Sequence, residues 1–77
     1  MSIKQFTKAM KYKLYVHSNK GSFDWKSNEM LMKQLKHEIK ELEEALDHGN
    51  SEMIIAEAAD VANYAYFIAD KARRGVK

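Results

Sequence analysis

Apolar residues recur every three or four positions along three stretches of the chain, and this is the period of an amphipathic helix. The first stretch covers about residues 3–18, with one face formed by Phe6, Met10, Leu14 and His17. The second covers residues 28–48, with one face formed by Leu31, Leu35, Ile39, Leu42 and Leu46. The third covers residues 52–74, with one face formed by Ile54, Ala58, Val61, Ala65 and Ile68. We therefore predict an all-α protein of three helices.

Short polar segments separate these stretches. Residues 19–22 read Asn-Lys-Gly-Ser, which favours a break, and an aromatic-bearing loop follows at residues 23–26. We expect Ser27 to cap the second helix, Gly49 to end it in a left-handed conformation and Ser51 to cap the third. The chain has no proline, no cysteine and three glycines, which excludes a disulfide framework, a thiolate metal site and a turn-rich β sandwich. With no repeat or linker, residues 1–77 are predicted to form one domain.

The third predicted helix is apolar around nearly its whole circumference, because Met53, Tyr64 and Phe67 occupy the face beside its stripe. Such a helix must be buried on nearly all sides. A chain of 77 residues buries only about 60–65% of its unfolded surface. We therefore expect a homo-dimer or homo-tetramer, in which a partner subunit completes a core like that of a four-helix bundle.

Charge is distributed unevenly along the chain. The net charge of +2 divides into +5 over residues 1–26, −6 over residues 27–60 and +3 over residues 61–77. An acidic middle between basic ends suits a divalent cation with an anionic ligand, or simple complementarity between segments or subunits. Lysines interrupt any apolar signal region near the amino terminus, and charged residues interrupt the apolar run at 53–69. We therefore expect a cytoplasmic protein that does not span a membrane.

Several acidic residues fall on apolar helix faces. Glu38 lies three residues after one stripe leucine and four before the next, and Glu57 has the same position on the third helix. Glu41 and Asp60 each follow three residues later. An unpaired buried carboxylate costs several kcal/mol, so these groups require either lysine partners or a divalent cation. Hard carboxylate oxygens suit Mg²⁺ or Mn²⁺.

The two acidic pairs read Glu38-Ile-Lys-Glu41 and Glu57-Ala-Ala-Asp60, with 15 residues between them. This pattern resembles the all-α nucleoside triphosphate pyrophosphohydrolases of the MazG type, a superfamily that includes dimeric dUTPases and dCTP pyrophosphatases. Residues 35–46 and 57–64 resemble the two acidic helices of that family. The Lys20-Gly21 and Trp25-Lys26 elements are similar to those of compact phage and bacterial members. The resemblance covers roughly residues 10–74.

The resemblance implies a Mg²⁺-dependent hydrolysis of nucleoside triphosphates to monophosphates and pyrophosphate, with Mn²⁺ as a possible substitute. It implies that Glu38, Glu41, Glu57 and Asp60 bind the metal. One carboxylate would orient or deprotonate the attacking water. We favour Glu41, with Glu38 as the other catalytic candidate.

Five further residues are candidates for substrate binding. Asn63 is expected to contact a phosphate, a sugar or a metal-bound water, or else to make a polar contact across a helix interface. Trp25 and Tyr64 are expected to sandwich the base, unless Trp25 is a core plug that anchors its loop. Lys13 and His17 share a helix face with Lys20, and Lys26 follows Trp25. Among these basic residues we favour Lys20 and Lys26 as phosphate contacts.

Two other classes of function remain open. The chain is alternatively a non-catalytic helical dimerisation or interaction module, whose acidic cluster is structural. Nucleic-acid binding through the first helix is disfavoured, because the centre of the chain is acidic and no arginine precedes Arg73. We therefore expect a nucleotide substrate and no nucleic-acid partner.

Overall fold

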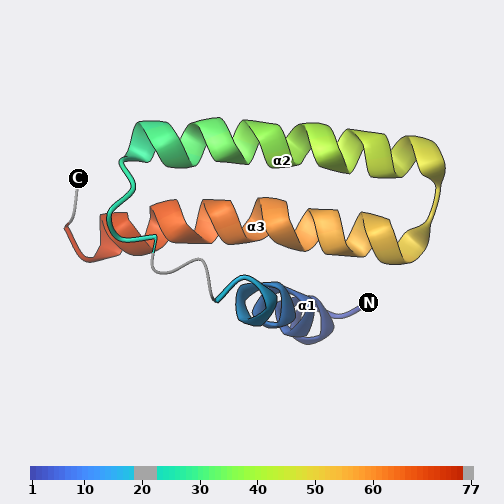
Figure 1. Ribbon diagram of the computed structural model, residues 1–77. Coiled ribbons are helices and arrows are strands. Elements are labelled where there is room, and N and C mark those ends of the chain that lie inside the picture. The colour runs from blue at the N-terminus through green and yellow to red at the C-terminus, as the bar shows by residue number, and fades with distance from the viewer. Residues whose placement is uncertain (19–22, 76–77) are drawn as a thin grey trace.

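The computed structural model describes residues 1–18 and 23–75, which form three helices: α1 (Ile3–Val16), α2 (Asn28–His48) and α3 (Ser51–Arg73). The described residues contain no strand, so the predicted all-α fold is confirmed. Helices α2 and α3 form a long antiparallel hairpin, and α1 crosses α3, so that it is seen nearly end-on in Figure 1. Both α1 and α2 pack against α3, and neither packs against the other. Helix α3 is therefore the central element.

Local sequence explains the ends of α2. The side chain of Ser27 accepts a hydrogen bond from the backbone N–H of Met30 at 3.2 Å, as an N-cap does. Gly49 ends the helix with φ at 74°, the left-handed conformation that glycine adopts without steric cost. Both predicted boundaries of α2 are thus confirmed.

The first and third helices depart slightly from the predicted bounds. Helix α1 ends at Val16, two residues before the predicted end. Asn50, and not Ser51, caps α3: its Oδ1 accepts from the backbone N–H of Met53 at 3.1 Å. The prediction of Ser51 was wrong because two good capping residues are adjacent here, and the first of them takes the cap.

The interior of one chain is small. Its fully buried apolar residues are Leu31, Ala45 and Ala59. On the predicted α2 stripe, Leu31 is buried, whereas Ile39 and Leu46 are exposed. Several apolar side chains of α3 are also exposed, namely Met53, Ile55, Ala65 and Tyr66. A single chain therefore leaves apolar surface on both helices of the hairpin uncovered.

Two sets of contacts fasten the loop before α2 to the end of α3. The ring of Phe23 stacks on Phe67, with centroids 4.2 Å apart. Beyond α3, Arg74 reaches back to Asp24 at 2.8 Å. The loop is therefore held by one aromatic stack and one ion pair, both formed with residues about 45–50 positions later in the chain.

A buried lysine adds a third contact to this loop. The side chain of Lys71 is buried and its ammonium donates to the backbone carbonyl of Lys26. This hydrogen bond partly offsets the desolvation of the charged group. The predicted break at residues 19–22, which includes Lys20, lies outside the described residues. None of the three helices has both the length and the hydropathy of a membrane-spanning segment.

Candidate metal and substrate site

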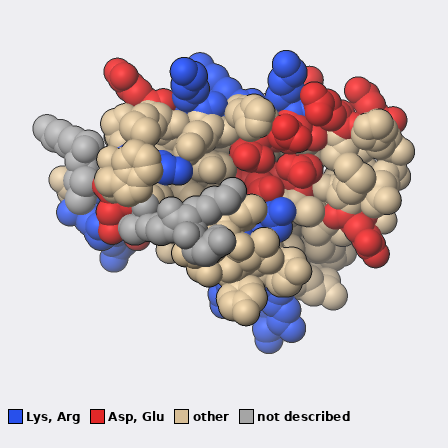
Figure 2. Space-filling model, in the orientation of Figure 1, with Lys and Arg blue, Asp and Glu red and all other residues tan. Residues whose placement is uncertain are grey.

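A cavity of about 610 Å³ opens where α1, α2 and the loop before α2 meet over α3. Four of its lining residues are the acids predicted from the sequence: Glu38, Glu41, Glu57 and Asp60. Figure 2 shows acidic side chains gathered on this face of the molecule, with lysine and arginine side chains around them. Candidate chemistry and a candidate binding space therefore coincide.

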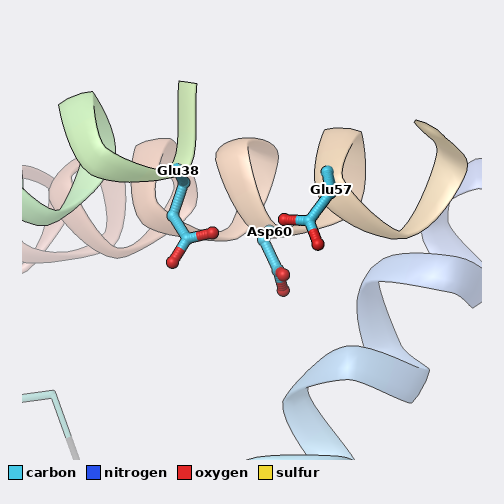
Figure 3. Close-up of side chains that lie close together, drawn as sticks. All are labelled: Glu38, Glu57 and Asp60. Atoms are coloured by element: carbon cyan, nitrogen blue, oxygen red, sulfur yellow. The ribbon is translucent and has the colours of Figure 1, made fainter. Parts of the chain in front are cut away.

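Three carboxylates form the centre of the site, and we call Glu38, Glu57 and Asp60 the carboxylate triad. One oxygen of each lies within 4.8 Å of the others. Glu57 and Asp60 are three residues apart and so share a face of α3. Glu38 comes from the antiparallel α2, and Figure 3 shows the three side chains turned toward one space. All three are partly buried.

Glu41, the fourth predicted ligand, stands apart from the triad. It lines the cavity one turn further along α2, and its Oε1 lies 3.3 Å from Nε2 of His37. Its carboxylate is not among the oxygens that converge in the described residues. The structure therefore brings together three of the four predicted ligands and places Glu41 at the edge of their site.

Burial and crowding of like charge shift the pKa values of Glu38 and Glu57. Burial raises the pKa of Glu38, and the negative charges of Asp60 and Glu57 raise it further. Burial and then Asp60 also raise the pKa of Glu57, while the nearby Lys13 lowers it. A raised pKa means that the ionised form is disfavoured where it stands. A bound cation would relieve this repulsion.

One cation already touches the triad. Nζ of Lys13, on α1, lies 3.3 Å from Oδ2 of Asp60, and the two side chains are 19% and 14% exposed. Sequence reasoning favoured Lys20 and Lys26 over Lys13 as phosphate contacts. The signal was present, because Lys13 lies between Met10 and His17, at three and four residues, on the inward face of its helix. A charge on an apolar face is the same anomaly that identified Glu38 and Glu57.

Asn63 lines the cavity and is only 4% exposed. Its Nδ2 donates to the backbone carbonyl of Met10 at 3.0 Å, so the polar contact across a helix interface is confirmed. Its Oδ1 is buried with no hydrogen-bond partner among the described residues. Leaving a buried acceptor unsatisfied costs about 1–3 kcal/mol. A donor from a ligand or a water molecule would remove this penalty.

Aromatic side chains line the cavity together with the acids. Tyr64 lines the cavity, and burial followed by the charges of Glu38 and Asp60 raises the pKa of its phenol. Phe23 and Phe67, which the sequence analysis did not assign to the site, line the cavity beside it. Their stacking depends on how the loop folds back onto α3, and no local pattern in the sequence predicts it.

Of the two predicted site residues in the loop before α2, Lys26 faces the cavity and Trp25 does not. Lys26 lines the cavity and its Nζ donates to Oε1 of Gln34 at 3.1 Å. Trp25 is 67% exposed and is absent from the cavity wall. This exposure contradicts the alternative of a core plug, and Trp25 does not face Tyr64 across the described cavity. Lys20 lies outside the described residues.

The fold and site define a small α-helical protein with a carboxylate cluster in an open cavity. The family model for the MazG nucleotide pyrophosphohydrolase domain matches residues 26–77, so the chain belongs to this family. The match contains α2, α3 and the whole carboxylate triad, and it confirms the resemblance of the two acidic pairs. Helix α1 lies outside the matched residues. Searches of curated proteins and of solved structures found no significant match.

Proposed function

We propose that this protein is a divalent-metal-dependent pyrophosphohydrolase of nucleoside triphosphates, with ribo- or deoxyribonucleotides as substrates. A water oxygen attacks the α-phosphorus, the anhydride bond to the β-phosphate breaks, and the products are a nucleoside monophosphate and pyrophosphate. The observation that carries this proposal is the carboxylate triad, which lies in a cavity formed largely by residues that match the family model. The family match supports a nucleotide as the substrate.

The donor set fits Mg²⁺ or Mn²⁺. The triad presents three oxygen donors from two helices within 4.8 Å of one another, and it presents no sulfur or nitrogen donor. Mg²⁺ prefers such hard oxygens and shares its coordination sphere with water and phosphate oxygens. When bound, the ion supplies charge neutralisation for the triphosphate and polarises the reacting phosphoryl group. Burial and then the neighbouring negative charges raise the pKa of Glu38 and Glu57, and such an ion would remove the repulsion between those charges.

The chain's own residues then divide the remaining tasks. We assign Glu41 to orient or deprotonate the attacking water, because it lines the cavity beside the triad without being part of it. Glu38 is the second candidate, since its raised pKa makes its carboxylate a better base. Either residue acts by holding the water in line with the breaking bond, and positioning contributes much of the catalysis in phosphoryl transfer.

The rest of the cavity has the size and chemistry for a nucleotide. Its volume of about 610 Å³ lies within the range of about 300–1,000 Å³ that small-molecule sites occupy. We assign phosphate binding to Lys26 and base contact to Tyr64, with Phe23 beside it. The unpartnered Oδ1 of Asn63 would accept from a sugar hydroxyl or a metal-bound water. Trp25 contacts the base only if its exposed ring moves toward the cavity.

We also propose that the protein works as a homo-oligomer, a dimer or a tetramer. The apolar side chains that α2 and α3 leave exposed include Ile39, Leu46 and Met53. Packing these positions against a second hairpin would complete a four-helix bundle. Light scattering coupled to size exclusion gives the mass in solution, and a monomer at micromolar concentration would contradict this part of the proposal.

The alternative is a non-catalytic helical interaction module. The ion pair between Lys13 and Asp60 favours it, because a structural acidic cluster is expected to have an internal cation. In that case the triad acids would be replaceable without loss of any enzymatic activity.

The deciding experiment is product analysis over a panel of canonical and modified nucleoside triphosphates, with Mg²⁺ and with excess EDTA. Glu57→Gln removes one triad charge, and Glu52→Gln is the matched control on the exposed surface of the same helix. The proposal expects monophosphate and pyrophosphate from wild type and the control, and neither from Glu57→Gln or with EDTA. No turnover of any nucleotide by a folded wild-type protein would favour the interaction module.

A further inference from the structure

Lys13 places a positive charge against one carboxylate of the triad. Its Nζ lies 3.3 Å from Oδ2 of Asp60, and Asp60 is one of the three converging carboxylates. Among the described residues, no other lysine or arginine forms an ion pair with the triad. The pair is largely shielded from water, which strengthens its attraction relative to an exposed pair.

This ammonium and a divalent ion cannot both hold Asp60 in the same way. An ion bound to the triad needs one carboxylate oxygen of Asp60 among those that converge within 4.8 Å, and the same carboxylate already contacts Lys13 through Oδ2. Two positive charges placed on one carboxylate also repel each other. A lysine can leave, because its ammonium ends a flexible stem of four carbons, whereas the helix that carries it stays in place.

Helix α1 is held independently of Lys13. Nδ2 of Asn63 donates to the backbone carbonyl of Met10, one turn before Lys13. A Lys13 side chain released from Asp60 therefore remains at the cavity wall, where it is already a lining residue. The only polyanion that the proposed reaction brings to this cavity is the triphosphate, and an ammonium is a good point-charge ligand for phosphate.

We infer that Lys13 is an intrinsic counter-ion of the carboxylate triad that leaves Asp60 when a divalent ion binds and then contacts the triphosphate of the substrate. This inference rests on the proposed function and deepens it. It assigns a role to α1, which lies outside the residues that match the family model. It also gives Lys13 two effects of opposite sign: the side chain weakens binding of free metal and strengthens binding of the metal–nucleotide complex.

The first test measures Mn²⁺ binding alone, by calorimetry or by the EPR signal of the free ion. Lys13→Met keeps most of the aliphatic stem and removes the charge, and Lys11→Met is the matched control on the exposed face of α1. We expect Lys13→Met to bind Mn²⁺ about fivefold more tightly than wild type, the factor for roughly 1 kcal/mol. Lys11→Met should match wild type. Equal or weaker binding by Lys13→Met would overturn the inference.

The second test measures binding of a non-hydrolysable α,β-methylene nucleoside triphosphate with Mg²⁺ at saturation. Lys13→Met should bind this complex about five- to tenfold more weakly than wild type, and Lys13→Arg should recover most of the loss. Unchanged nucleotide affinity in Lys13→Met would overturn the second half of the inference. If circular dichroism shows that Lys13→Met does not fold, an NMR titration of the wild type with Mg²⁺ tests the inference instead. The side-chain signals of Lys13 should shift on addition of Mg²⁺, and those of Lys11 should not.

These outcomes separate the inference from the function on which it rests. Suppose that the wild type hydrolyses triphosphates and that Lys13→Met behaves as wild type in both titrations. This result would support the proposed function and overturn the inference about Lys13. A folded wild type that neither binds Mn²⁺ nor turns over a nucleotide overturns both.

Discussion

The hairpin of α2 and α3 and the single helix α1 contribute to the site in different ways. The hairpin supplies all three carboxylates of the triad, and its two helices pack along each other (Figure 1). Helix α1 has no fully buried residue, and two polar contacts at its inner face tie it to α3: the hydrogen bond to Met10 from Asn63 and the ion pair of Lys13 with Asp60. The hairpin therefore carries the proposed chemistry, whereas α1 contributes one wall of the cavity.

This difference agrees with the family match, which begins at Lys26 and leaves α1 outside. The proposed binding of a metal ion and a triphosphate requires a fixed arrangement of carboxylate ligands, and the packed hairpin of α2 and α3 provides it. A helix held by few contacts can vary without disturbing that arrangement. Two results would contradict this division of roles: loss of hydrolysis after a substitution on α1, or unchanged hydrolysis after a substitution in the triad.

The largest effect is expected from Glu57→Gln. Removing one of three converging charges should lower turnover by at least about a hundredfold, because the charge stabilisation of the transition state is lost. The same variant should raise the melting temperature in the absence of metal, since it relieves repulsion in the triad. Steady-state kinetics and thermal denaturation measure the two effects. Turnover within threefold of wild type would remove the triad from the mechanism.

A smaller effect is expected from Asn63→Ala, which removes one of the two polar contacts between α1 and α3. Loss of the hydrogen bond to Met10 should weaken the docking of α1 by about 1 kcal/mol. Amide hydrogen exchange should therefore become faster in α1 than in wild type and stay unchanged in the middle of α2. Equal acceleration in both helices would show that α1 and the hairpin unfold as one unit, and the distinction between them would fail.

The stability of the metal-free protein should depend on pH through the triad. The pKa values of Glu38 and Glu57 in the folded state are raised above their ordinary value of 4.5. Between the ordinary and the raised value the folded state binds more protons than the unfolded state, so the free energy of unfolding falls as pH rises through this window. Urea denaturation across this range measures the fall. Glu57→Gln or added Mg²⁺ should reduce it, and an unchanged slope in both would contradict this account.

The smallest effect is expected from Trp25→Ala, compared with Phe23→Ala. Trp25 is 67% exposed, so its loss should change the free energy of unfolding by no more than about 0.5 kcal/mol. Phe23 stacks on Phe67 and lines the cavity, so Phe23→Ala should destabilise the protein by about 1–3 kcal/mol and raise KM. Chemical denaturation and kinetics on the two variants measure these values. A larger effect of Trp25 on KM would mean that its ring reaches the nucleotide in the complex.

The sequence predicted what depends on local rules. Helical period and capping chemistry located all three helices, with an error of one residue at each end of α3 and of two at the end of α1. The carboxylate triad was predictable because Glu38 and Glu57 stand on apolar stripes. The helix ends and the positions of these acids on apolar faces follow from the spacing of residues within one helix. The convergence of Glu38 with Glu57 and Asp60 also requires the packing of α2 against α3.

The remaining features depend on how helices meet, which spacing alone does not specify. Lys13 contacts Asp60 because α1 crosses α3 at that level, and Phe23 enters the cavity wall because its loop folds back onto Phe67. Glu38 and Glu41 have the same three-residue spacing as Glu57 and Asp60, yet Glu41 pairs with His37 and lies outside the triad. Tertiary packing therefore selected the members of the site from a larger set of candidates.

The most direct test of the central claim is hydrolysis of a nucleoside triphosphate in ¹⁸O-labelled water, followed by ³¹P NMR. The account predicts that wild type with Mg²⁺ places the label in the monophosphate and none in pyrophosphate, and that excess EDTA stops the reaction. Label in pyrophosphate would contradict attack at the α-phosphorus. No product from folded wild-type protein with Mg²⁺ would contradict the assignment of the carboxylate triad to nucleotide hydrolysis.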